Sequence, residues 1–107
     1  MILIQIHFNS QEQADKVVPV LIREKLVYRI YQIENSSDLM NTEYGGFLEK
    51  TIIYQAPTRA LLFSRIEEVI NELCMDHIPL FFGIPITNFS SHHTGLIMAH
   101  TQTTNDK

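Results

Sequence analysis

The first 26 residues decide the fold, and they read MILIQIHFNSQEQADKVVPVLIREKL. Large apolar side chains occupy every second position from Ile2 to Phe8, which is the alternation of a β-strand with one buried face. Ser10 follows as a potential helix cap, with Gln13 three residues later as in a capping box. Apolar residues then recur at helical spacing: Ala14, Val17, Val18, Leu21, Ile22 and Leu26. The segment therefore predicts a strand followed directly by an amphipathic helix.

The middle of the chain predicts one long β-hairpin. Aromatic and β-branched residues are frequent over 27–34 and again over 47–55, as is typical of strands. Gly45-Gly46 lies between these two segments and predicts the turn that joins them.

The last part of the chain repeats the order of helix and strand. Pro57-Thr58 predicts the start of a second helix, whose apolar stripe runs to Leu73. The apolar run over 78–86 predicts a fourth strand, and its Pro85 favours an edge position or a bulge. A short terminal helix is expected over 90–99.

The predicted order β-α-β-β-α-β is that of an α+β, ferredoxin-like fold. Right-handed crossovers place both helices on one face of a four-stranded antiparallel sheet. We expect a single domain over residues 1–99 and a polar C-terminal tail over 100–107. The other sheet face would stay open and partly apolar, which predicts a homo-oligomer.

Composition narrows the class of protein. The chain has 107 residues, with 8 Lys and Arg against 12 Asp and Glu, for a net charge of −4. This balance argues against a nucleic-acid binder, which needs a basic surface. The apolar run over 78–86 is too short to cross a bilayer, so no membrane association is expected. The single cysteine excludes an internal disulfide, and the N-terminus lacks the basic region of a signal peptide. We expect a cytoplasmic protein.

The order of elements, with Glu24-Lys25-Leu26 closing the first helix and Ile84-Pro85-Ile86 closing the last strand, resembles the CutA-type divalent-cation tolerance family. The resemblance runs without a gap over 9–97. It implies a ferredoxin-like homotrimer, similar in architecture to the nitrogen-regulatory PII signalling proteins. It also implies a non-catalytic protein that binds copper or another divalent cation. Three further positions fit the family pattern: Ala14, Ile33 and Thr58.

The scaffold positions match the family better than the polar ones do. The family segment Glu-Leu-His-Pro-Tyr-Glu-Val-Pro corresponds here to ELCMDHIP over residues 72–79. A cysteine that many members have early in the second strand is replaced by Arg29. Near the C-terminus, His93 and Leu96 occupy the positions of a tyrosine and a tryptophan.

The candidate metal ligands are Cys74, Asp76 and His77, which follow one another closely at the turn between the second helix and the last strand. A thiolate, a carboxylate and an imidazole together suit copper or zinc. The family resemblance places this turn in an inter-subunit cleft, where His93 of the next chain would join it. The alternative is structural: a buried cysteine at a helix end, followed by solvated turn residues.

A second hypothesis is a PII-like signalling protein that binds a small anionic ligand such as a nucleotide. Arg29, Lys50 and Arg59 could hold the anion. The four tyrosines of the hairpin could stack on a planar group or simply pack across the strands: Tyr28, Tyr31, Tyr44 and Tyr54. A trimeric scaffold for a partner protein and a small dimeric monooxygenase are further alternatives; the latter needs a deep pocket between sheet and helices. No nucleophile, zinc-protease or paired-cysteine motif is present in the sequence, so we expect no catalysis.

Overall fold

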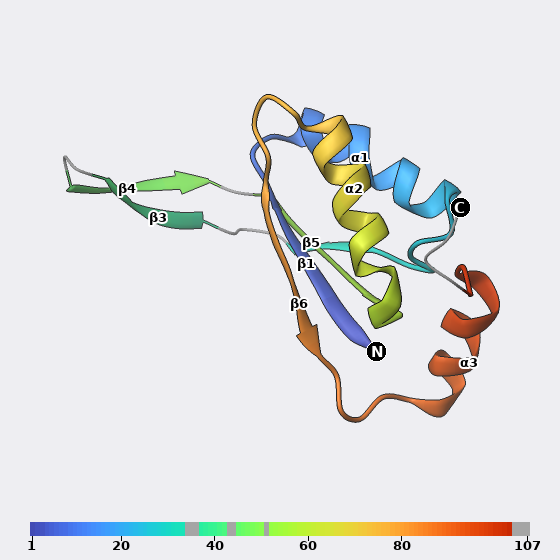
Figure 1. The fold of residues 1–107 in the computed structure, drawn as a ribbon. Helices are drawn as coiled ribbons and strands as arrows, with labels where there is room; N and C mark the ends of the chain where they lie inside the picture. Colours follow the sequence, from blue (N-terminus) through green and yellow to red (C-terminus); the bar gives the residue numbers. More distant parts are fainter. Residues whose placement is uncertain (34–36, 43–44, 51, 104–107) are drawn as a thin grey trace.

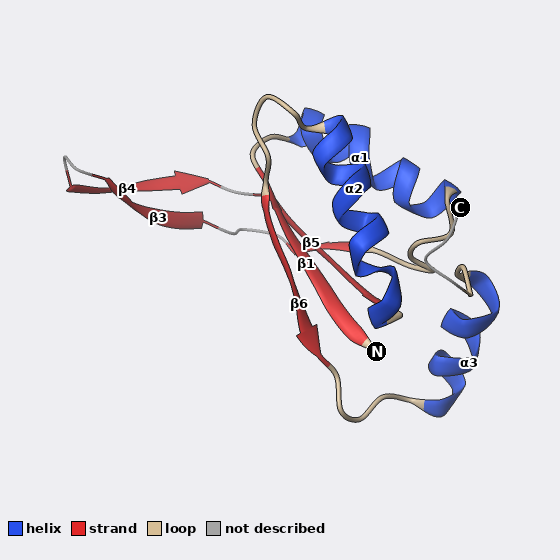
Figure 2. Cartoon of the chain, viewed as in Figure 1, coloured by secondary structure: helices blue, strands red, loops and turns tan. Residues whose placement is uncertain are grey.

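The computed structural model describes residues 1–33, 37–42, 45–50 and 52–103, the second and third of these as backbone. Figure 1 shows the course of the chain, and Figure 2 separates its strands from its helices. The elements are β1 (Ile2–Phe8), α1 (Gln11–Arg23), β2 (Tyr31–Ile33), β3 (Ser37–Thr42), β4 (Gly45–Lys50), β5 (Ile52–Thr58), a 3-10 turn (Ala60–Leu62), α2 (Phe63–Leu73), β6 (Leu80–Pro85) and α3 (Ser91–His100).

Four strands form one antiparallel sheet in the order β2-β5-β1-β6. Helices α1 and α2 lie side by side over one face of this sheet (Figure 2). The predicted ferredoxin-like α+β fold is therefore confirmed, with α3 as a third helix beside the sheet. Pro85 lies in β6, an edge strand, where its missing N–H disrupts no ladder between two neighbours.

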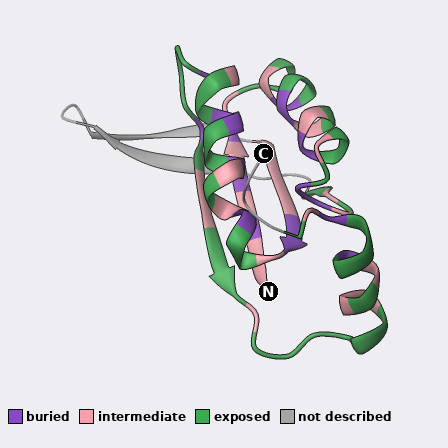
Figure 3. Ribbon diagram, turned by 45° about the vertical axis from the view of Figure 1, so that its right-hand side comes forward, coloured by how far each residue is buried: buried purple, intermediate pink, exposed green. Residues whose placement is uncertain are grey.

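The core lies between the sheet and the two helices. Ile4, Ile6 and Phe8 are almost fully buried, as the alternation over β1 predicts. Figure 3 shows buried stretches, in purple, on the helices and on the strands of the sheet. Apolar side chains of both helices pack against the strand: Ala14, Val17, Leu21, Ile66, Val69 and Ile70. Each fully buried aliphatic side chain contributes about 1.5–3 kcal/mol through removal from water.

Helix α1 begins and ends at local signals. The Ser10 hydroxyl accepts a hydrogen bond from the Gln13 N–H at 3.1 Å, as the capping pattern predicts. At the other end Lys25 has a φ of 58°, the left-handed conformation that reverses the chain after many helices. The Leu26 N–H then bonds the Leu21 carbonyl at 3.0 Å, and Leu26 is fully buried. This reversal directs the chain toward β2.

The predicted long hairpin is divided in the structure. Of the predicted strand over 27–34, the structure describes residues 27–33, and only Tyr31–Ile33 among these form a strand. Strand β3 pairs with β4 in a separate two-stranded sheet that projects from the body (Figure 1). Gly45-Gly46 was expected to be the turn, but both glycines belong to β4, opposite Thr42 and Asn41. The strand register places the connection at 43–44, outside the described residues. A two-residue link suffices between antiparallel strands, so the register outweighs the glycine signal.

The second helix starts later than predicted. Pro57-Thr58 was expected to open it, but both residues end β5, where Thr58 pairs with Ile2. The Thr58 hydroxyl donates to the Leu26 carbonyl at 2.6 Å, and Thr58 is fully buried. This long-range bond satisfies a buried carbonyl, so Thr58 stays in the sheet. Helix α2 begins five residues later at Phe63.

The C-terminal helix forms as predicted and is attached to the body at its far end. The Arg59 side chain donates to the Thr101 hydroxyl at 2.9 Å and to the Met98 carbonyl at 2.7 Å. The Gln102 N–H donates to the Lys25 carbonyl at 2.9 Å. The chain is thus packed on the body past the expected domain boundary at residue 99, whereas residues 104–107 lie outside the described part. Among the helices described, none has the length and apolarity to cross a membrane.

Candidate functional site

Two pockets lie at opposite ends of β1. The cysteine pocket has a volume of about 290 Å³ and begins at Asn9, directly after the strand. The tyrosine pocket has a volume of about 470 Å³ and includes Pro57, which pairs with Leu3 at the start of the strand. Seven extended residues separate the two ends by about 20 Å. The cysteine pocket is lined by Asn9, Ser10, Glu12, Gln13, Lys16, Leu73, Cys74, Met75, Asp76 and His77. The tyrosine pocket is lined by Tyr28, Arg29, Tyr31, Pro57, Phe89, Ser90, His93 and Ile97.

The structure brings the three sequence-predicted ligands of the turn to the cysteine pocket. Cys74 follows the last residue of α2 and its N–H still bonds the Ile70 carbonyl at 2.9 Å. The His77 N–H bonds the Cys74 carbonyl at 3.1 Å, which closes a tight turn. Cys74 is buried, with 5% of its surface exposed, whereas Asp76 and His77 are exposed.

Helix α1 fastens this turn through its backbone carbonyls. The Gln13 amide donates to the His77 carbonyl at 2.6 Å, and the Asn9 amide donates to the same oxygen at 3.2 Å. The Lys16 ammonium donates to the Leu73 carbonyl at 3.3 Å, at the end of α2. These bonds hold the backbone of the turn and leave the His77 side chain exposed to solvent.

Burial raises the pKa of the Cys74 thiol, because removal from water disfavours the thiolate. The Lys16 charge and a hydrogen bond from Gln13 act in the opposite direction with smaller effect. The group is therefore a protonated thiol at neutral pH and must release a proton when it binds a metal.

The described residues of one chain do not place three or more His, Cys, Asp or Glu side chains together as a metal-binding group. His93, the fourth sequence-predicted ligand, lies in the tyrosine pocket at the other end of β1. A site that combines Cys74 with His93 thus requires two chains.

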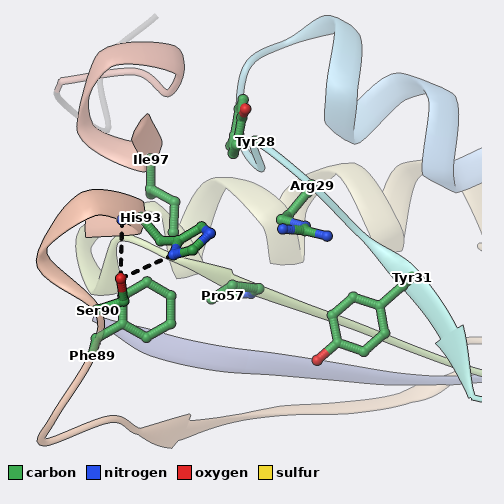
Figure 4. Close-up of a pocket in the computed structure, with 8 residues that line it drawn as sticks. All are labelled: Tyr28, Arg29, Tyr31, Pro57, Phe89, Ser90, His93 and Ile97. Atoms are coloured by element: carbon green, nitrogen blue, oxygen red, sulfur yellow. Dashed lines mark hydrogen bonds between the residues drawn. The ribbon is translucent and has the colours of Figure 1, made fainter. Parts of the chain in front are cut away.

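The tyrosine pocket is walled mainly by aromatic and aliphatic side chains from three separate segments (Figure 4). Tyr28 comes from the segment that leads into β2 and Tyr31 is the first residue of that strand, whereas Phe89 precedes α3. The Tyr28 ring packs against the His100 ring with centroids 4.8 Å apart, which fixes its orientation.

Few of the described residues that line this pocket carry polar side-chain groups. Among the described residues, no hydrogen bond or ion pair engages the exposed Arg29 guanidinium, which reaches between Tyr28 and Pro57 in Figure 4. The His93 Nδ1 atom lies 2.9 Å from the Ser90 hydroxyl, and the other ring nitrogen faces the middle of the pocket (Figure 4).

Arg59, another predicted anion-binding residue, is not among the described residues that line this pocket. Arg59 is engaged by the end of α3, through Thr101 and Met98. The Lys50 side chain lies outside the described part of the structure.

No family model and no curated protein sequence matches this chain. Solved structures do match it over nearly its whole length. CutA1 from Pyrococcus horikoshii is 22% identical, with a TM-score of 0.84 over 96% of this chain and 100% of that one. CutA1 from Oryza sativa is 14% identical, with a TM-score of 0.86 over 96% of this chain and 94% of that one. This chain has the CutA1 fold.

A third similar structure is described as the periplasmic divalent cation tolerance protein CutA from Archaeoglobus fulgidus. It is 18% identical, with a TM-score of 0.79 over 94% of this chain and 98% of that one. The resemblance inferred from the sequence is thus confirmed at the level of the CutA1 fold.

Within this CutA1 fold, sequence patterns located one pocket better than the other. The turn at Cys74 was visible as a cluster of ligand-type residues. Phe89 and Ser90 were not singled out, and neither was the placement of Arg29 and His93 in one pocket. The only sequence signal at Phe89 and Ser90 is that a serine precedes an apolar helix. This signal predicts where the helix starts, but it does not predict which residues lie opposite that start.

Proposed function

We propose that this protein is a CutA-like, non-catalytic homotrimer that binds copper or another divalent cation in the cytoplasm as part of a metal response. The observation that carries the proposal is the likeness of nearly the whole chain to structures named for divalent cation tolerance. The clustering of Cys74, Asp76 and His77 in one small pocket supports it. Thiolate and imidazole ligands favour copper among the candidate ions.

Self-association is supported by the open face of the sheet. Ile84 pairs with Leu3, and Leu80 pairs with His7, so these side chains lie opposite the buried face of β1. Leu80 is 60% exposed and Ile84 is 43% exposed. The β3–β4 hairpin also projects from the body, and an isolated two-stranded hairpin is only marginally stable in water. A second and third copy would cover both features.

In the proposed trimer, the metal lies between chains. The turn of one subunit, with Cys74, Asp76 and His77, would meet His93 of the next subunit. Within one chain, the turn and His93 are about 20 Å apart, the length of β1, so one chain alone cannot form the site. Binding would draw the proton from the Cys74 thiol.

Native mass spectrometry during a copper titration tests this proposal. We expect a trimer that takes up copper, and a Cys74→Ala/His77→Ala double variant that remains trimeric but binds copper at least tenfold more weakly. His92→Ala is the matched control, because His92 is exposed and lines neither pocket described above. A monomer, or unchanged copper affinity in the double variant, would refute the proposal.

A second candidate function is a PII-like response to a small anionic ligand. It is favoured by Arg29, whose charge faces the larger pocket with no ion pair to another described residue. Saturable ATP binding in the absence of metal, lost in Arg29→Ala, would support this function over metal binding.

A further inference from the structure

We propose that the tyrosine pocket binds a small planar aromatic molecule that carries one negative charge, an aromatic carboxylate being the simplest case. This inference rests on the second candidate function and names its ligand class. The aromatic part would lie among Tyr28, Tyr31 and Phe89, and the anionic group would bind Arg29 (Figure 4).

The size and lining of the pocket favour a small organic molecule. Its volume of about 470 Å³ lies within the usual range of small-molecule sites, which are mostly apolar with a few placed polar groups. Tyr31 is 46% exposed and Phe89 is 37% exposed, so both rings present apolar surface at the pocket. Aromatic side chains bind planar rings through stacked or edge-to-face contacts.

The charges of the pocket select an anion. Arg29 provides a guanidinium, and no Asp or Glu is found among the described residues that line the pocket. A guanidinium binds a carboxylate through two parallel hydrogen bonds. The inward-facing nitrogen of His93 and the Ser90 hydroxyl add polar atoms on the opposite wall (Figure 4).

The same features disfavour a nucleotide polyphosphate. A polyphosphate requires several cationic groups or a loop of convergent backbone N–H groups. Among the described residues that line the pocket, Arg29 is the only Arg or Lys, and Arg59 is already bonded to α3. The chemistry of the pocket therefore matches one charge on a largely apolar molecule.

Calorimetric titration of the full chain with 2-naphthoate and its neutral analogue 2-naphthamide tests the inference. We expect 2-naphthoate to bind saturably. The substitution Arg29→Gln should lower the affinity for 2-naphthoate by about fivefold and leave the affinity for 2-naphthamide unchanged. Arg23→Gln is the matched control, because Arg23 is an exposed arginine at the end of α1 that does not line the pocket. Phe89→Ser is expected to weaken both compounds.

Several results would overturn the inference. They are the absence of saturable 2-naphthoate binding, an equal loss of 2-naphthoate affinity in Arg29→Gln and Arg23→Gln, or an equal loss of affinity for both compounds in Arg29→Gln.

A titration with ATP distinguishes the aromatic ligand class from the more general anion-binding function. If ATP binds through Arg29 and 2-naphthoate does not, the aromatic ligand class is wrong and the anion-binding function stands. If neither compound binds, both fall.

Discussion

The cysteine pocket and the tyrosine pocket lie at opposite ends of β1, and different interactions maintain the shape of each pocket. Hydrogen bonds from Gln13, Asn9 and Lys16 to backbone carbonyls fasten the turn at Cys74. The tyrosine pocket is enclosed by packed side chains whose segments are far apart in sequence, and one of its walls is α3. The first pocket is therefore fixed by polar contacts between the start of α1 and the turn at Cys74, whereas the second depends on the docking of one helix.

This difference has a consequence for ligands. A rigid polar turn with one buried thiol suits a metal ion that a second chain helps to hold. An aromatic pocket beside a helix attached mainly at its far end suits an organic molecule, since the wall can adjust to the bound group. Perturbing α3 should change the tyrosine pocket and leave the cysteine pocket unchanged.

The largest effect is expected for Ile97→Ala. Ile97 is 1% exposed and is the buried residue of α3. Truncation leaves a cavity beneath the helix and should weaken its docking by about 2–4 kcal/mol. Amide hydrogen exchange should accelerate over 91–100 and stay unchanged over 70–77. Met98→Ala, at a position 42% exposed, is the control. Equal acceleration in both segments would show that the two pockets are not independent.

A smaller effect is expected for Arg59→Met. The substitution removes the bonds to the Thr101 hydroxyl and the Met98 carbonyl. We expect α3 to lose about 1 kcal/mol of docking free energy. The effect is small because Arg59 is only half-buried, so water can form hydrogen bonds with the groups that Arg59 no longer contacts. The same exchange experiment measures it, with Arg23→Met as control. An unchanged exchange rate over 91–100 would mean that packing alone holds the helix.

The smallest effect concerns the Cys74 thiol. Because burial raises its pKa in the folded state, the folded protein holds this proton more tightly than the unfolded chain does. Its contribution to stability is present below the ordinary thiol pKa and is lost as pH rises through the raised value. Urea unfolding at pH 7 and pH 10 should show that the free energy of unfolding decreases more for the wild type than for Cys74→Ala. An equal decrease in the variant would mean that groups other than Cys74 cause it.

Much of the fold could be predicted because its signals are local. The alternation over Ile2–Phe8 and the capping by Ser10 specify β1 and the start of α1 within a few residues. The predictions at Gly45-Gly46 and Pro57-Thr58 were wrong for one common reason. Each prediction relied on a short local signal that a tertiary interaction overrides. At Gly45-Gly46 the pairing of β3 with β4 dominates, and at Pro57-Thr58 the buried hydrogen bond from Thr58 to Leu26 dominates.

The candidate site was predictable only in part. Cys74, Asp76 and His77 are neighbours in sequence, so their shared pocket follows from the turn between helix and strand. The assignment of His93 to the same metal stays a prediction that requires a second chain. Arg29 and Arg59 have the same side chain, yet one faces a pocket and the other is bonded to α3.

The sequence by itself determined most of the order of strands and helices and most of the core residues in β1, α1 and α2, because apolar periodicity selects the buried face of each element. Tertiary structure alone decided that Cys74 and His93 lie at opposite ends of β1, that Arg59 is bonded to α3 and that Phe89 faces Tyr28 and Tyr31 across a pocket. These relations join residues that are far apart in the chain. They depend on sheet register and helix docking, which a local pattern of side chains does not encode.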